Sequence, residues 1–293
     1  MRNVSLMKKR SVLAWFLIMP VLLTRVFTAL YPMMMTFWYS LRDYNIIRGT
    51  NFYIGLGNFK KIFSDKTLID TLWFTFLFTV TSIILHLILG IAFAELMNIK
   101  FKGRRFIRTI MLIPWAMPLI VAGIAAYWMF NGEYGLINDI LSRLFGVKPD
   151  WLVTIWGARF AVIITDVWKD TPFMAVMLLA GLQGIDTEIY ESATVDGAGS
   201  WKKLTCITLP MIKPVLITVL IFFTIWRMTS FDLVYAMTKG GPGTATSLLS
   251  YRVYMEGFMN LSFGYSSAIG VCIFIIGGIV GITGIMMLKR AKD

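Results

Sequence analysis

The chain has 293 residues, of which 57% are hydrophobic and 15% charged, and its mean hydropathy is +0.72. A soluble domain carries about a quarter of its residues as charged side chains, so these values exclude an ordinary soluble globular protein. The net charge of +12 would suit nucleic acid, but the basic residues lie unevenly between long apolar runs, which indicates a membrane protein instead.

Apolar runs of membrane-spanning length follow one another along the chain. A transmembrane helix needs about 20 mostly apolar residues, and the runs that meet this requirement lie at about 12–41, 68–97, 106–130, 153–181, 212–236 and 264–288. They lack the alternation of a barrel strand, and backbone groups in lipid must pair within their own segment, so helices are expected. The predicted fold class is all-α: a polytopic membrane protein with six transmembrane helices in one domain, residues 1–293.

The first run follows Lys8, Lys9 and Arg10, an arrangement that a secretory signal peptide also has. It resumes after Arg25, continues through Ser40 and lacks a clear small-x-small cleavage site. We therefore expect a retained first span.

Lysine and arginine are distributed unequally between the two sides that these spans define. The side with both termini and the loops 98–105 and 182–211 carries 15 of them, counted with its adjoining span ends, against 9 on the other side. Because cytoplasmic loops are enriched in Lys and Arg, the richer side is expected to be cytoplasmic. Both termini are then cytoplasmic.

The predicted external loops carry helical patterns and chain breakers. In the loop 42–67, apolar residues at helical spacing predict a short amphipathic helix at the outer interface: Leu56, Phe59, Ile62 and Phe63. The loop 131–152 carries Gly132, Gly135, Asn138 and Pro149. The loop 237–262 opens with the breaker cluster Gly240-Gly241-Pro242, after which helical spacing returns at Tyr251, Tyr254 and Phe258.

The histidine and the two cysteines form no metal-binding pattern. His86 lies in the second run, where a hydrogen bond between helices is expected rather than a proton relay. Cys206 and Cys272 fall at different depths of the predicted topology and are not expected to pair.

Charged residues interrupt the run 153–181. Asp166, Lys169 and Asp170 lie at positions i, i+3 and i+4, so they share one helix face, with Phe173 one turn further on. Charges inside a span are costly and usually face a cavity or a partner.

A polar, helix-forming segment follows, at about 183–213. Asp186 is suited to cap a helix over 187–195, and Gly197 and Gly199 are expected to break that helix. A linker rarely needs about 30 residues in a compact membrane domain, so the segment predicts a docking surface; a solvated linker is the alternative.

The second half of this segment is also expected to be helical. Ser200 can cap a helix over 201–208, Pro210 is expected to end it, and Pro214 suits the first turn of the next span. In that span, Phe223, Trp226, Arg227 and Ser230 follow 0, 3, 4, 7 spacing, which places them in a single stripe.

Five motifs, in order along the chain, resemble those of permease subunits in binding-protein-dependent ABC importers. The central one resembles the "EAA" loop, with Ser192 in place of an alanine and Leu204 where the family often has phenylalanine. The resemblance covers about residues 12–288 and is nearest to the maltose-type and glycerol-phosphate-type permeases. The motifs are Gly55-Leu56-x-Asn58-Phe59; Gly135-Leu136-Ile137-Asn138; Trp168-Lys169 with Pro172-Phe173 and Ala180-Gly181-Leu182-Gln183; Glu191-Ser192-Ala193 with Asp196-Gly197-Ala198, Ile207 and Leu209-Pro210; and Gly240-Gly241-Pro242.

This resemblance implies the type I ABC importer permease fold and half of an alternating-access pathway. It implies a second permease subunit, as a heterodimer, two copies of a cytoplasmic ATPase, an extracytoplasmic solute-binding protein and the lipid bilayer as partners, and no nucleic acid. No cofactor is expected in this chain, since ATP and Mg would bind the ATPase. The expected location is the cytoplasmic membrane of a bacterium or archaeon. The ATPase-coupling residues would be Glu191, Ala193, Asp196, Gly197, Ala198, Leu209 and Pro210.

The sugar-lining positions of the maltose-type permeases, carried over without gaps, coincide with the two stripes above. They are Asp166, Lys169, Asp170, Phe173, Phe223, Trp226, Arg227 and Ser230. Arg227 replaces neutral amides common in maltose-type members, so a phosphate- or sulfonate-bearing cargo is open beside disaccharides and oligosaccharides. The alternative is a buried ion network that only locks helices together.

Two other functions are open to a chain of this composition. An ion-gradient-driven secondary transporter would explain the intramembrane charges, but not the helix-turn-helix segment, and no inverted repeat is evident. An integral-membrane enzyme would need a catalytic constellation, which the sequence does not provide. The chain lacks the Gly-x-x-x-x-Gly-Lys-Ser/Thr loop, so ATP hydrolysis is expected in a partner.

Overall fold

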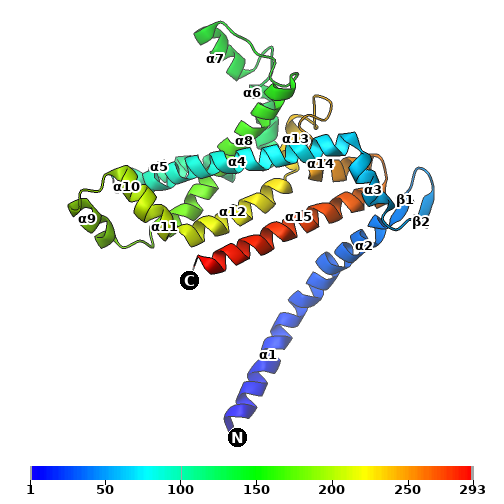
Figure 1. Cartoon of the computed structure of the whole chain (residues 1–293), viewed down its shortest axis with the longest axis horizontal. Helices are drawn as coiled ribbons and strands as arrows, with labels where there is room; N and C mark the ends of the chain where they lie inside the picture. The colour runs from blue at the N-terminus through cyan, green and yellow to red at the C-terminus, as the bar shows by residue number, and fades with distance from the viewer. Residues whose placement is uncertain (1, 100, 292–293) are drawn as a thin grey trace. The chain divides into compact units, whose positions relative to one another are not determined.

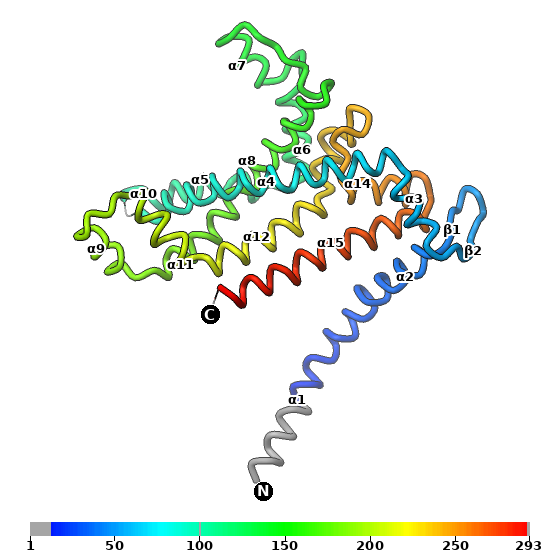
Figure 2. Tube along the Cα trace, viewed as in Figure 1, coloured from blue at the N-terminus to red at the C-terminus, as the bar shows by residue number. Residues whose placement is uncertain are grey.

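The computed structural model describes residues 2–99 and 101–291, and the described chain is mostly helical (Figures 1 and 2). Contacts within the chain divide it into two compact units. One consists of Met1–Ile62 and Val253–Val271, and the other of Phe63–Arg252 and Cys272–Asp293.

The first unit begins with a continuous helical stretch and a short hairpin. The stretch comprises α1 (Arg2–Arg25), the π-helical turn η1 (Val26–Leu30) and α2 (Tyr31–Ser40). The strands β1 (Arg42–Asn45) and β2 (Thr50–Tyr53) pair antiparallel around a turn in which Gly49 has φ +64°. The π-helical turn η3 (Met255–Met259) and the start of α15 (Phe263–Arg290) complete the unit.

Asn58 of the Gly-Leu-x-Asn-Phe motif holds the end of α2 against the hairpin. Its side-chain amide donates to the backbone oxygens of Ser40, at 2.9 Å, and Arg42, at 2.8 Å. The carbonyls at a helix C-terminus have no partner within the helix, so a buried amide that serves them stabilises the corner. This motif residue therefore has a structural task within its own unit.

The predicted amphipathic helix of the first external loop is confirmed as α3 (Gly57–Ser64). Ile62 of this helix is buried, whereas Phe63 is exposed, as is Leu56, which lies just before the helix. An exposed apolar edge of this kind suits the membrane interface.

In the second unit, α4 (Lys66–Asn98) packs along α8 (Ile155–Leu182) and α12 (Lys213–Met228) (Figure 1). Small residues permit this close approach, because a Cβ on Gly90 would lie 3.1 Å from Met174 Cγ. The apolar core of the unit is built where these helices meet, from Ala94, Met97, Met174, Ala175, Leu178, Leu179, Leu182, Ile212, Val219 and Phe223.

Two of the predicted continuous spans are wrong, because each is broken. The run 106–130 forms α5 (Arg104–Ala116) and α6 (Leu119–Met129), with an angle of 89° between them. Met117 is extended because the next residue is Pro118, which disfavours helix in the residue before it. The run 212–236 ends its helix at Met228 and resumes as α13 (Asp232–Met237).

The expected number of spans stays a prediction. Within the described residues, three helices are long and apolar enough to cross a membrane, and the number rises to five if each of two bent helix pairs is counted as one span. The helix α8 has 28 residues, enough to span, but carries the charged residues predicted above.

The loop 131–152 contains α7 (Leu136–Phe145). Asn138 organises the loop: its amide nitrogen donates to the carbonyls of Gly132 and Pro149, and its oxygen accepts from Trp151 Nε1 at 2.8 Å. Gly135 and Gly146 stand at the two caps of this helix.

Helical structure returns after the glycine-proline cluster as predicted, in α14 (Leu249–Tyr254) and η3. The cluster itself forms a closed loop, in which Thr246 Oγ1 donates to Gly241 O at 2.7 Å and lies 2.7 Å from Thr238 Oγ1. The two cysteines are unpaired, which confirms that prediction.

Candidate functional site

The polar segment between α8 and α12 forms short helices that project from the ends of those two long helices (Figure 2). The first, α9 (Thr187–Val195), has the predicted bounds. Asp186 stands at its N-cap position, but its side chain makes no capping hydrogen bond. The second begins at Ser200 rather than after it, with Gly199 as N-cap.

The prediction that Pro210 ends the second helix is wrong. This helix runs as α10 (Ser200–Lys203), the π-helical turn η2 (Leu204–Thr208) and α11 (Leu209–Met211). Pro210 lies within α11, in the last turn of this helix, which ends at Met211. The chain bends by 73° at Ile212, before α12.

The turn between α9 and α10 depends on Gly197. Its φ of +77° lies in the left-handed region that side chains resist, and a Cβ there would have no atom within 4 Å. The Ala198 N–H closes the turn by donating to Ala193 O at 2.9 Å. Five of the predicted coupling residues, Glu191, Ala193, Asp196, Gly197 and Ala198, therefore lie on α9 and this turn, while Leu209 and Pro210 lie on α11.

Side-chain contacts link the two short helices. Tyr190 Oη lies 2.9 Å from Thr208 Oγ1, and Lys203 Nζ donates to Thr194 Oγ1 at 2.6 Å. Two apolar side chains that sequence reasoning missed are left exposed beside these contacts: Val195 is 89% exposed and Trp201 75%. Such exposed apolar groups beside carboxylates are typical of an interaction surface.

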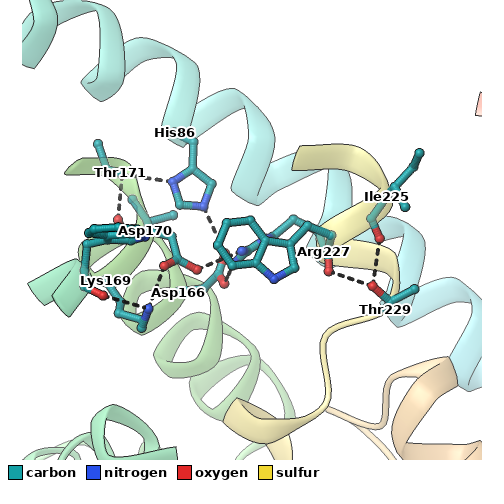
Figure 3. A network of polar contacts seen from close by, with 11 residues as sticks. His86, Asp166, Lys169, Asp170, Thr171, Ile225, Arg227 and Thr229 are labelled. Carbon is teal, nitrogen blue, oxygen red and sulfur yellow. Dashed lines mark hydrogen bonds and ion pairs between the residues drawn. The ribbon is translucent and has the colours of Figure 1, made fainter. Parts of the chain in front are cut away.

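Four charged residues of α8 and α12, together with His86 of α4, form one network (Figure 3). Arg227 on α12 donates through Nη1 to Asp166 Oδ1 and through Nη2 to Asp170 Oδ2, the latter at 2.7 Å. Lys169 Nζ donates to Asp170 Oδ1 at 2.8 Å. His86 on α4 places Nε2 at 3.1 Å from Asp166 Oδ2.

This network is shielded from solvent, and its positive and negative charges are equal in number. Asp166 and Asp170 are 0% exposed, Arg227 1% and Lys169 5%. Each carboxylate oxygen has a partner, and two carboxylates face two cations, which offsets part of the cost of burying the charges; Arg227 Nε is buried without a hydrogen-bond partner among the described residues. The predicted hydrogen bond between helices at His86 is confirmed, with its Nδ1 at 2.9 Å from Thr171 Oγ1.

Aromatic rings cover one side of the network. Trp226 lies under the Arg227 guanidinium, with 4.8 Å from Cζ to the ring centroid, and packs against Phe223 at 5.8 Å. Phe173 meets Trp226 edge-to-face at 5.9 Å and 88°. Trp115, from the end of α5, stacks on Phe173 with ring centroids 4.9 Å apart and planes 4° apart.

Seven of the eight predicted lining residues are thus brought together by α8 and α12. Ser230 differs: α12 ends at Met228, so the predicted stripe does not continue to Ser230 as a helix face. Its hydroxyl is buried without a hydrogen-bond partner among the described residues.

Sequence reasoning missed two contributors to this layer. Trp115 lies at a break that hydropathy did not indicate. The second is a buried polar stripe that leads along α4 to the predicted His86. Its other members are polar residues at helical spacing in an apolar run, a signal that could have been read from the sequence: Thr71, Thr75, Thr79 and Ser82. In the described residues, no group of three or more His, Cys, Asp or Glu side chains could hold a metal ion.

Comparison with known proteins gives concordant results. Residues 86–290 match the family described as "Binding-protein-dependent transport system inner membrane component". The chain is 42% identical over 273 residues to the trehalose/maltose transport system permease protein MalF of Thermococcus litoralis, a match covering 92% of this chain and 90% of that protein. It is 39% identical over 241 residues to the sulfoquinovosyl glycerol transport system permease protein SmoG of Agrobacterium fabrum, covering 82% and 78%.

The fold has a match among solved structures. A chain of a bacterial ABC transporter involved in the import of the acidic polysaccharide alginate superposes with a TM-score of 0.86 at 21% identity. The superposition covers 99% of this chain and 100% of that one, so the two share a fold along their whole lengths.

Proposed function

The chain belongs to the family of binding-protein-dependent transport system inner membrane components, and on that premise we propose that it forms half of the pathway of an ATP-driven importer for a sugar or sugar derivative. Its type I ABC importer permease fold agrees with the prediction from the motifs. The observation that carries the proposal is the exposed pair of helices α9 and α10, which a multi-pass membrane protein presents outside its apolar helices.

The proposed complex contains three kinds of partner. A second permease subunit completes the pathway as a heterodimer, two copies of an ATPase bind the coupling segments, and a solute-binding protein delivers the cargo. ATP and Mg belong to the ATPase, so this chain is a transporter subunit without a catalytic site. We place it in the cytoplasmic membrane of a bacterium or archaeon with both termini in the cytoplasm, on the basis of its Lys and Arg distribution.

The proposed coupling surface is the outer face of α9 and its turn. Glu191 and Asp196 are exposed and offer carboxylates to a basic partner, and Gly197 leaves the turn without a side chain in the way. The exposed Val195 and Trp201 add apolar area that a protein partner would cover. Closure of the ATPases would be transmitted through this surface into α8 and α12, the helices that carry the buried charges.

The proposed cargo pathway follows the aromatic side of the network. In this structure the charges satisfy one another, so the cargo would gain access to them when α8 and α12 separate during alternating access. Arg227 would then be free to bind a hydroxyl, phosphate or sulfonate oxygen. The sulfoquinovosyl glycerol and trehalose/maltose relatives support a glycoside as cargo. Arg227 could bind the hydroxyls of a neutral glycoside or the charged group of an anionic one, so both kinds of glycoside are compatible with the proposal.

Affinity purification from the native membrane, with mass spectrometry of the bound proteins, tests the complex. A second permease and a soluble ATPase should copurify with the chain. Reconstituted vesicles should then take up cargo with ATP after an ionophore has collapsed ion gradients. Uptake that instead requires a gradient, by a chain that purifies alone in detergent that preserves known complexes, would replace the proposal with a secondary transporter.

A further inference from the structure

A charged residue stands near the middle of the first membrane span. The helical stretch Leu13–Ser40 has 28 residues and is long and apolar enough to cross a membrane, and Arg25 lies within it. At a rise of about 1.5 Å per residue, Arg25 is roughly 18 Å along the helix axis from the nearer end of this stretch. An arginine snorkels to the interface from positions near a helix end. A residue as deep as Arg25 therefore needs a partner inside the membrane.

The Arg25 side chain has no partner among the described residues. It is exposed, as are all residues from 13 to 32, and its guanidinium takes part in no hydrogen bond or ion pair within the described chain. An unpaired charge in the hydrocarbon region is costly, so intramembrane arginines pair with other groups or face water. The first span consequently carries an interaction that this chain alone leaves unmade.

The carboxylates in the apolar runs of this chain are unsuited to Arg25. Asp166 and Asp170 are the two in the middle of a run, and every oxygen of both already has a partner in the buried network. The remaining three stand near the ends of their runs, away from mid-membrane depth: Asp70, Glu95 and Asp232. A carboxylate for Arg25 is therefore expected on another chain.

Polar residues continue from Arg25 along one side of the helix. Thr28 Oγ1 donates to Thr24 O at 2.7 Å, so the two threonines lie one above the other. Arg25 and Thr28 are three positions apart, as are Thr28 and Tyr31, so all four residues share a stripe. The π-helical turn η1, which has no buried residue, begins directly after Arg25, and such turns often accompany functional sites. Polar side chains in membranes hydrogen-bond across helices, so this stripe suits a protein helix better than lipid.

Building on the proposed function, we propose that the stripe Thr24, Arg25, Thr28 and Tyr31 contacts the second permease subunit, and that Arg25 forms an ion pair there with an intramembrane Asp or Glu. The pair discriminates between partners, because a subunit without a carboxylate at this depth leaves the arginine charge alone in the membrane. Two copies of this chain would bring together two arginines and no free carboxylate. The ion pair therefore favours the heterodimer over the homodimer.

Copurification of the second permease from the native membrane tests the ion pair. Arg25→Leu should lower the amount of second permease recovered with this chain by roughly 3- to 15-fold, the range expected for interhelical polar contacts, while Arg25→Lys, which keeps the charge, restores most of it. Failed insertion would not explain such a loss, because leucine favours insertion and arginine opposes it. The matched control is Leu23→Ala, which should keep the recovery unchanged: Leu23 is 52% exposed and faces away from Arg25 on the same helix.

A photoreactive amino acid in the intact complex tests which molecule covers the stripe. Benzoylphenylalanine in place of Thr28 leaves Arg25 intact and should cross-link to a segment of the second permease that carries an intramembrane Asp or Glu. In place of Leu23 it should not label that segment. Cross-links from position 28 only to lipid or to this chain, or unchanged recovery with Arg25→Leu, would overturn the proposal and leave the importer function intact. Absence of a second permease from the unsubstituted complex would instead overturn the proposed function.

Discussion

The coupling segment and the buried charge network use polar residues in opposite ways. Around α9 and its turn the carboxylates Glu191 and Asp196 are exposed. The turn is held by backbone hydrogen bonds and a few side-chain hydrogen bonds. In the network, Asp166 and Asp170 are 0% exposed and every carboxylate oxygen is paired within the chain. A surface made for a partner leaves its groups open, whereas charges buried among membrane helices must first satisfy one another.

Gly197→Asp should have the largest effect on transport, with uptake reduced to background while the protein remains inserted and folded. A Cβ at this position meets no atom within 4 Å in this chain, so the main effects are a strained left-handed backbone and a charge at the coupling turn. Uptake is measured in vesicles and insertion by the amount of protein in the membrane fraction.

Gly49→Asp is the matched control for that variant. Gly49 also has positive φ, +64°, and open space, but it lies in the hairpin of the other unit. It should transport normally. Equal loss of uptake in both variants would mean that backbone strain alone explains the defect, and normal uptake by a folded Gly197→Asp would remove the coupling role.

Arg227→Ala should have the largest effect on stability, about 3–5 kcal/mol, because it leaves two buried carboxylates without their shared partner. The melting temperature of the detergent-solubilised complex measures this loss. The double variant Asp166→Asn with Arg227→Gln leaves one buried cation, Lys169, facing one buried carboxylate, Asp170. It should therefore be more stable than Arg227→Ala.

Uptake by that double variant separates the two roles of the network. If Arg227 binds cargo, a stable double variant remains impaired, with a raised KM. Recovery of normal uptake together with stability would show that the charges serve only to lock the helices.

His86→Phe should have a smaller effect, about 1–3 kcal/mol of stability. The substitution keeps a ring against Phe223, now 5.3 Å from His86, and removes the contacts to Asp166 and Thr171, which leaves a buried carboxylate oxygen without that partner. Thermal unfolding of the complex checks this. His86→Gln, which retains hydrogen-bonding groups, should be closer to the unsubstituted protein; equal melting temperatures for all three would mean that these bonds contribute little.

Lys203→Met should have the smallest effect, with no measurable change in melting temperature. Its bond to Thr194 Oγ1 is solvent-exposed, and such bonds exchange readily with water. A large loss of stability would contradict the contrast between the two regions, because it would show that the coupling segment also depends on its internal polar contacts.

Local periodicity was sufficient to locate much of the fold and of the site. The long helices α4, α8 and α15 fall within a few residues of the predicted runs, and α9 has the predicted bounds. The two lining stripes on α8 and α12 were also predictable, apart from Ser230, because residues three or four positions apart share a helix face whatever surrounds the helix. The motifs identified the coupling turn, whose glycine conformation is a property of a few consecutive residues.

Only the tertiary structure decided how these elements meet. His86 and Arg227 are 80 and 61 residues from Asp166 along the chain, and no local pattern states that all three share one buried site. Hydropathy likewise predicted one span where α5 and α6 are separated by a break, since the residues on both sides of Pro118 are apolar. Burial determined the outcome in both cases: a charge removed from water takes whichever partner the packed helices bring within reach, and a broken helix end persists where neighbouring groups such as Lys169 satisfy its carbonyls.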